Sequence, residues 1–130
     1  MKFNPPGRCF TFEIPDAWWR EAGMPAFQPT SPSYAWRPDP ERPTLPVVCI
    51  PIARVRRGAR TREGGDFDRA RMTDVLRGIA RGDRIPPVAV MPLPPEGQPF
   101  THRLYSGFHR FSASIAAGYT HVPVVIFEEF

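Results

Sequence analysis

The chain has few cysteines, a single lysine and no long apolar run. Its two cysteines, Cys9 and Cys49, are too few for a disulfide framework, and Cys49 lies in an apolar stretch that predicts a buried thiol. No apolar run approaches the roughly 20 residues that cross a bilayer, and the N-terminus lacks the apolar core of a signal peptide. A disulfide-rich secreted domain is therefore excluded, and we expect a cytoplasmic protein with no membrane partner.

Arginine supplies nearly all of the positive charge. Lys2 is the single lysine among 17 basic residues, the net charge is +4, and proline is frequent at 18 residues. A GC-rich coding genome explains most of this bias, so the clustering of arginines is more informative than their number. Five of them gather between residues 54 and 62, namely Arg54, Arg56, Arg57, Arg60 and Arg62. The cluster is either a patch that neutralises nucleic-acid phosphates or a solvated loop enriched by codon bias.

The first 46 residues differ from the rest of this 130-residue chain, which has the length of one domain. They predict a short strand at 10 to 14 and a short helix at 17 to 22, capped by Asp16 and ended by Gly23. Seven prolines between residues 25 and 46 then forbid regular structure and predict an extended arm. Four aromatic residues are expected to pin this arm onto the core: Trp18, Trp19, Tyr34 and Trp36.

Residues 47 to 130 predict one compact mixed α/β (α+β) domain with a small mixed sheet and two main helices. Strands are expected at 47–52, 88–91, 100–105 and 122–127, and helices at about 67–81 and 108–117. Pro51 indicates that the first of these strands lies at an edge of the sheet or contains a bulge. Asp66 or Asp68 is expected to cap the first of these two helices, and Gly82 to end it.

The segment from Leu104 to Ser114 carries the sharpest functional hypothesis. It predicts a strand end, a tight turn at Gly107 and a helix start, where unpaired N–H groups and a partial positive charge favour phosphate. His109 and Arg110 fall on the first turn, and arginine can grip phosphate oxygens in a bidentate fork. The alternative is a turn glycine followed by two solvated residues.

No metal site is predicted from the acidic residues and histidines. Glu63, Asp66 and Asp68 could hold Mg²⁺ beside a phosphate, but helix capping explains two of them more simply. His102 and His121 lack the spacing of metal ligands and are expected to be structural.

Three segments together resemble the ParB/sulfiredoxin superfamily. Ile-Pro-Pro-Val at residues 85 to 88 resembles the family's entry into its central strand. Ser-Gly-Phe-His-Arg-Phe at 106 to 111 resembles sulfiredoxin's Gly-Gly-Cys-His-Arg-Tyr and the Gly-x-x-Arg box of ParB. Residues 118 to 126 resemble the family's glycine and closing Val-Pro-Val strand. With the order of elements, the resemblance covers about residues 47 to 127 and implies binding of nucleotide or nucleic-acid phosphates.

The resemblance also implies which residues would bind. A phosphate would lie against Ser106, Gly107, His109, Arg110 and Arg71. Of these, Gly107 would permit a close approach of the backbone, and Arg71 takes the place of a sulfiredoxin lysine that contacts nucleotide. Arg54 or Arg62 would add charge from the loop, and the cofactor would be a nucleoside triphosphate with Mg²⁺.

Two departures limit what the resemblance implies. Phe108 stands where sulfiredoxin has its catalytic cysteine, so no sulfinyl-ester chemistry is expected. ParB's acidic box residue is also missing. The sequence ends at Phe130, without ParB's helix-turn-helix region and dimerisation tail, so reading of a centromere site is not expected.

The sequence therefore predicts a stand-alone ParB-like domain that binds the phosphates of a nucleotide or nucleic acid. NTP hydrolysis and nuclease-type cleavage stay open, with His109 as the candidate for proton transfer. The alternative is a non-catalytic accessory protein of a bacterial plasmid or mobile element that binds duplex DNA through the arginine cluster. A third reading is an interaction domain whose phosphate site has decayed. Formation of a homodimer is left open.

Overall fold

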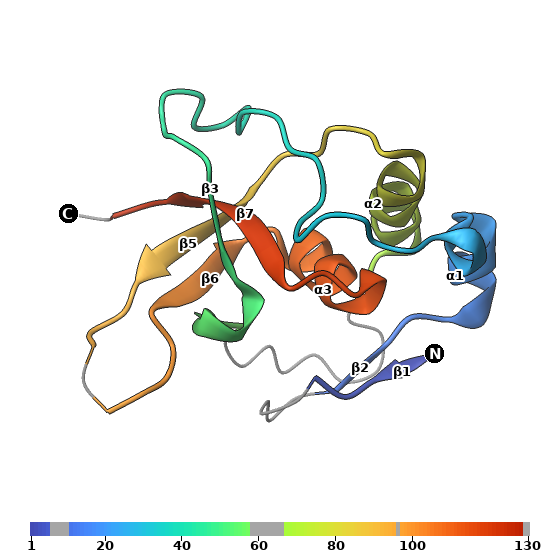
Figure 1. The fold of residues 1–130 in the computed structure, drawn as a ribbon, viewed down its shortest axis with the longest axis horizontal. Coiled ribbons are helices and arrows are strands. Elements are labelled where there is room, and N and C mark those ends of the chain that lie inside the picture. Colours follow the sequence, from blue (N-terminus) through green and yellow to red (C-terminus); the bar gives the residue numbers. More distant parts are fainter. Residues whose placement is uncertain (6–10, 58–66, 96, 129–130) are drawn as a thin grey trace.

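The computed structural model describes residues 1–5, 11–57, 67–95 and 97–128 (Figure 1). Its helices are α1 (Asp16–Glu21), α2 (Arg69–Arg81) and α3 (Phe108–Ala117), with 3₁₀ turns η1 (Met24–Ala26) and η2 (Ile52–Arg54). Its strands are β1 (Lys2–Phe3), β2 (Phe12–Glu13), β3 (Val48–Pro51), β4 (Val55–Arg56), β5 (Val88–Pro92), β6 (His102–Ser106) and β7 (His121–Ile126). No helix in these described ranges is long and apolar enough to cross a membrane.

Five strands form a mixed sheet in the order β3-β7-β5-β6-β4, which confirms the predicted fold class. The central strand β5 runs parallel to β7 and antiparallel to β6, and β3 pairs antiparallel with β7 at one edge. The other edge strand, β4, pairs parallel with β6 and was not predicted, because it is only two residues long and lies in the arginine cluster. Strands β1 and β2 form a separate antiparallel pair.

The core lies between the sheet and the helices. Figure 1 shows α3 against the sheet, with α2 next to α3 and α1 beyond α2, and the contacts between elements follow the same order. Strands β5 and β7 are buried along most of their length, which explains their nearly continuous apolar sequences. Phe111 of α3 and Leu76 of α2 are at most 1% exposed. The first residues of α2 and α3 are therefore held by a rigid core.

The ends of α2 and α3 follow the predicted signals. The Asp68 carboxylate caps α2 by accepting from the N–H groups of Ala70 and Arg71, and Gly82 ends the helix in the left-handed region. Helix α3 lies between Gly107 and Gly118, both with positive φ.

The prediction that Asp16 caps the first helix is wrong. Pro15 occupies the cap position, and Asp16 is the first helical residue, so its carboxylate instead pairs with the N-terminal ammonium at 2.9 Å. This hydrogen bond and charge hold the pKa of Asp16 below its usual value.

The proline-rich arm runs along the segment that enters β5. Ile85 donates its N–H to the Ala35 carbonyl and accepts from the Arg37 N–H, forming a parallel bridge opposite Trp36. Tyr34 is 2% exposed, and its hydroxyl donates to the Pro86 carbonyl at 2.7 Å. The side chain of Trp36 is 41% exposed, so this aromatic residue does not pin the arm as predicted.

Cys49 is exposed, which contradicts the predicted buried thiol. The apolar stretch that suggested burial is β3, and an edge strand with an exposed face leaves part of such a stretch in solvent. Cys9 lies outside the described residues.

The buried hydroxyl of Tyr34 makes stability fall at alkaline pH. Burial raises the pKa of Tyr34 above its usual value of about 10, and the nearby Arg110 guanidinium offsets only part of this rise. The unfolded chain loses this proton above about pH 10 while the folded protein keeps it, so the free energy of unfolding falls as pH rises. Urea unfolding at about pH 9 and about pH 11 should show a smaller fall for Tyr34→Phe than for wild type. Burial also raises the pKa of Tyr119, which is present in both wild type and Tyr34→Phe. If the free energy of unfolding falls equally in the two proteins, the loss does not come from Tyr34 and this assignment is contradicted.

Candidate functional site

The N-terminal ends of α2 and α3 are joined side by side. His109, on the first turn of α3, accepts a hydrogen bond through Nε2 from the N–H of Asp68, the cap residue of α2, at 2.9 Å. The His109 ring also meets the rings of Phe67 and Phe108 edge-on, at 5.5 and 5.9 Å between centroids. The two helix starts are thus brought together, and at α2 the N–H groups of Ala70 and Arg71 already donate to the Asp68 carboxylate.

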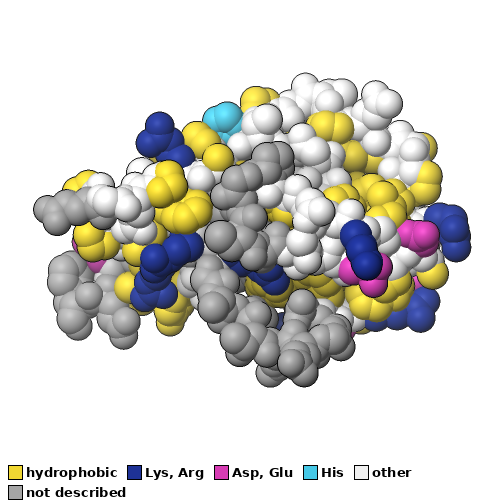
Figure 2. Space-filling model, turned by 90° about the horizontal axis from the view of Figure 1, so that it is seen from below, with side chains coloured by type: hydrophobic (Ala, Val, Ile, Leu, Met, Phe, Trp, Pro, Cys, Tyr) yellow, Lys and Arg dark blue, Asp and Glu magenta, His cyan; other side chains and the backbone are white. Residues whose placement is uncertain are grey.

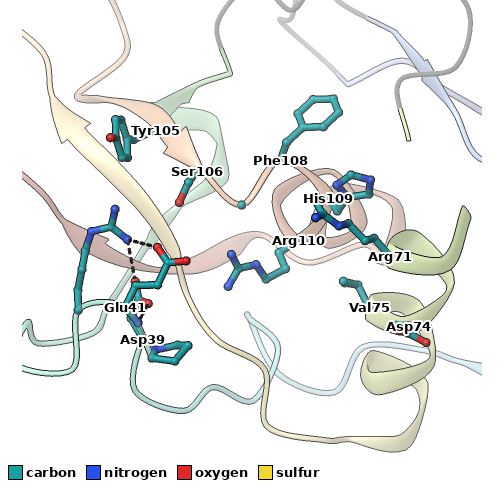
Figure 3. Close-up of a pocket in the computed structure, with 13 residues that line it drawn as sticks. Asp39, Glu41, Arg71, Asp74, Val75, Tyr105, Ser106, Phe108, His109 and Arg110 are labelled. Carbon is teal, nitrogen blue, oxygen red and sulfur yellow. Dashed lines mark hydrogen bonds and ion pairs between the residues drawn. The ribbon is translucent and has the colours of Figure 1, made fainter. Parts of the chain in front are cut away.

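A cleft of about 580 Å³ lies at this junction (Figure 3). It is lined by the end of β6 and the start of α3, by the first two turns of α2, and by a turn of the arm. Those lining residues are Tyr105, Ser106, Gly107, Phe108, His109 and Arg110, then Arg71, Asp74 and Val75, and finally Asp39, Pro40, Glu41 and Arg42. All five residues predicted to bind phosphate therefore lie on one cleft.

Gly107 is required by the close packing of two elements. Its φ of +96° lies in the left-handed region, and a Cβ there would lie 2.8 Å from Val88 Cγ1 and 3.1 Å from Val88 Cα. The close approach that this glycine permits is thus an approach to β5, in addition to any approach to a ligand.

The two arginines of the cleft have different surroundings. Arg110 is half-buried, and one terminal nitrogen donates to the Pro87 carbonyl at 2.9 Å. Figure 3 shows the rest of its side chain reaching into the cleft toward Asp39 and Glu41. Arg71 is exposed, and no carboxylate of the described residues lies within ion-pair distance of it. Arg71 is therefore the more available of the two cations.

The arm contributes an acidic turn that sequence reasoning missed. Asp39 is 5% exposed, accepts from the Glu41 N–H and pairs with Arg42 at 3.4 Å. Glu41 pairs with the same arginine at 3.5 Å. No sequence signal pointed to this wall, because it meets the cleft through contacts between segments more than 60 residues apart.

The arginine cluster does not form one exposed patch. Arg54 and Arg56 are exposed, on η2 and β4, but Arg57 is only 9% exposed and lies over the Phe108 ring at 4.5 Å from its centroid. Arg60 and Arg62 lie outside the described residues. On the face seen in Figure 2, the described basic side chains form separate groups. Arg57 therefore packs inward on an aromatic ring, and Arg54 and Arg56 are the exposed members of the cluster among the described residues.

The histidines outside the cleft bond to their own neighbours. His102 contacts the Thr101 hydroxyl and His121 the Thr120 hydroxyl, each through Nδ1 at 2.8 Å. Desolvation lowers the pKa of His102. Within the ranges that the structure describes, no group of three His, Cys, Asp or Glu residues could hold a metal ion. Glu63 and Asp66, considered above for Mg²⁺, lie outside these ranges.

The fold is shared with a known protein. Sulfiredoxin from Arabidopsis thaliana superposes with a TM-score of 0.50 and 24% sequence identity, over 64% of this chain and 85% of that chain. No protein-family model and no curated protein matches the sequence. The similarity confirms the sulfiredoxin-like fold that the resemblance implied.

Phe108 fills the position where the sequence resemblance places sulfiredoxin's cysteine. It is 5% exposed, stacked on Phe67 at 5.2 Å and covered by the Arg57 guanidinium. This position therefore belongs to an aromatic and cationic stack at the start of α3.

Proposed function

We propose that this protein binds the phosphate groups of a nucleotide or nucleic acid in the cleft between the starts of α2 and α3. The observation that carries the proposal is the convergence of the start of α3 with two arginines, Arg71 of α2 and Arg110 of α3, on one cleft. Helix N-termini and guanidinium groups are both good partners of phosphate oxygens, the first through N–H groups and the second through a fork of donors.

The proposal also rests on how the charges of the cleft are paired, because the cleft is lined by three carboxylates as well as three arginines. Asp39 and Glu41 are both paired with Arg42, and Asp74 is paired with Arg77 at 3.3 Å. In the described part of the chain, Arg71 and the remaining donors of Arg110 have no such partner. An incoming phosphate would therefore meet the Arg71 guanidinium, which has no ion-pair partner in the described part of the chain, and the Arg110 guanidinium, which also faces Asp39 and Glu41.

The proposal is for binding, without a committed turnover step. The His109 Nε2 atom, which a general base would need, already accepts from the Asp68 N–H. Because Phe108 offers no thiolate, sulfiredoxin chemistry is not part of the proposal. Any Mg²⁺ would arrive with a nucleoside triphosphate, since the described residues include no ready-made metal site.

Arg71→Ala should weaken nucleotide binding about 10- to 100-fold, the loss expected for a charge-assisted hydrogen bond to phosphate. Calorimetric titration with ATP, CTP, GTP and UTP, each with and without Mg²⁺, measures this loss. The matched control is Arg81→Ala, because Arg81 is an exposed arginine at the other end of α2. It lies about 15 Å along the helix axis from Arg71, which exceeds a Debye length of about 10 Å.

Wild type that binds neither a nucleotide nor a nucleic acid, or Arg71→Ala that binds as well as wild type, would contradict the proposal. Binding of duplex DNA with steep salt dependence and no nucleotide preference would instead favour the DNA-accessory reading. Arg110→Ala is a poorer first test, because it also removes the donor to the Pro87 carbonyl and should lower stability by about 1 to 3 kcal/mol.

A further inference from the structure

A second, more apolar groove adjoins the phosphate cleft. It has a volume of about 620 Å³ and lies between the arm and the end of β7. Its lining residues are Glu41, Arg42, Pro43, Thr44, Leu45, Ile126, Phe127 and Glu128. Glu41 and Arg42 line both the cleft and the groove, so the two spaces adjoin at these residues. Each volume falls in the range of sites for small organic ligands, roughly 300 to 1,000 Å³.

An aromatic pair stands where the two spaces meet. Tyr105, which lines the cleft, stacks on Phe127, which lines the groove, with 5.1 Å between ring centroids and 30° between planes. Arg42 lies over both rings, at 5.6 Å from the Tyr105 centroid and 5.0 Å from that of Phe127. Tyr105 is 47% exposed and Ile126 is 37% exposed, although both are large apolar side chains. Flat, partly exposed rings beside a guanidinium plane are the usual surface on which nucleobases stack.

We infer that the junction of the groove and the cleft is the base-binding half of the proposed site, and that Tyr105 and Arg42 are the residues on which the base of a nucleotide stacks. The inference rests on the proposed function and names the ligand class of that site. Tyr105 lies two residues before Gly107, the cap residue of α3, so the Cα atoms of these two residues are at most about 7 Å apart. A ribose linking base to phosphate bridges a gap of this kind.

The charges select a mononucleotide over a longer single strand. Glu128 lines the groove without an ion pair among the described residues, and a strand that continued past the base would bring further phosphates against this carboxylate. A mononucleotide carries all its phosphates at one end, beside Arg71 and Arg110. Bases within a duplex are stacked inside the helix and cannot reach Tyr105. The arm, which lies outside the region of family resemblance, would thus give the site its base contact through Arg42.

Removal of the Tyr105 ring should weaken the preference for a nucleotide over inorganic triphosphate while leaving the binding of inorganic triphosphate in place. The probes are ATP, CTP, GTP, UTP and inorganic triphosphate, each titrated into wild type and Tyr105→Ala. For the best nucleotide, the ratio of its affinity to that of inorganic triphosphate should fall about 5- to 150-fold in the variant, the factor that stacking of one base supplies. Tyr105→Phe keeps the ring and should keep the ratio. Trp36→Ala is the matched control, because it removes an exposed aromatic ring of the arm that lines neither space.

The inference is overturned if the affinity ratio is the same in wild type and Tyr105→Ala. It is also overturned if Tyr105→Ala weakens the binding of a single-stranded oligonucleotide but not the binding of any mononucleotide. Should Tyr105→Ala fail to fold, Tyr105→Leu keeps an apolar side chain without a ring and is read in the same way. Wild type that binds triphosphate but prefers no nucleotide overturns the inference and leaves the proposed function intact. Wild type that binds no nucleotide, no inorganic triphosphate and no nucleic acid contradicts both the inference and the proposed function.

Discussion

Gly107→Ala should lower the free energy of unfolding by about 2 to 5 kcal/mol, because two independent costs meet at this position. A residue with a Cβ pays about 1 to 2 kcal/mol for the left-handed conformation that φ of +96° imposes. The added methyl group would also lie 2.8 Å from Val88 Cγ1 and 3.1 Å from its Cα, and overpacking of this kind costs about 1 to 3 kcal/mol. The Val88 backbone belongs to the central strand and cannot move aside cheaply.

Gly82→Ala separates the two costs and serves as the control for Gly107→Ala. Gly82 has φ of +75°, but nothing lies within 4 Å of a Cβ built there, so only the conformational cost of about 1 to 2 kcal/mol applies. Urea unfolding followed by circular dichroism measures both variants. If the two substitutions cost the same, the contact with Val88 carries no energy, and the account of why glycine precedes α3 is wrong.

The sequence predicted best those elements whose ends carry local signals. The bounds of α3 were predicted as 108 to 117 and are Phe108–Ala117, because a glycine with positive φ flanks each end. Helix α2 likewise follows from Asp68 and Gly82. In both cases the signal lies within one turn of the boundary that it sets.

Long-range packing explains what the sequence did not predict. Whether Cys49 faces solvent depends on which strand lies at the sheet edge, and whether Arg57 turns inward depends on the Phe108 ring, about 50 residues away. The five proposed phosphate contacts were placed on one cleft by a family resemblance, but the acidic turn at Asp39 and Glu41 lies outside that resemblance. Local patterns carry no information about such contacts.

The arm and the cleft share a support at the entry to β5. Tyr34 donates to the Pro86 carbonyl at 2.7 Å, and Arg110 donates to the next carbonyl, that of Pro87, at 2.9 Å. Because Pro86 and Pro87 have no N–H of their own, their carbonyls are the backbone's only hydrogen-bonding groups there. Tyr34 thus holds the arm at Pro86, which is the neighbour of Pro87, the residue whose carbonyl orients Arg110.

Tyr34→Ala should therefore destabilise the whole protein, although Tyr34 belongs to a proline-rich arm. Removal of a fully buried aromatic side chain costs about 3 to 5 kcal/mol, and Tyr34 is 2% exposed within the common core. Tyr34→Phe keeps the ring and removes only the donor to Pro86, so its cost should be about 1 to 3 kcal/mol. Trp36→Ala, two residues away with a ring that is 41% exposed, should cost less than either.

Urea unfolding of these three variants, followed by both tryptophan fluorescence and far-ultraviolet circular dichroism, distinguishes an integral arm from an appended one. Trp18 and Trp19 report on the first 46 residues, whereas the helical signal comes mostly from α2 and α3. If the arm is part of the cooperative unit, both signals shift together to lower urea in Tyr34→Ala. If fluorescence shifts while the helical signal stays at the wild-type midpoint, the arm folds apart from the domain. In that case neither the acidic turn nor Arg42 could be a fixed wall of the cleft, and the base-binding groove would lose one of its two sides.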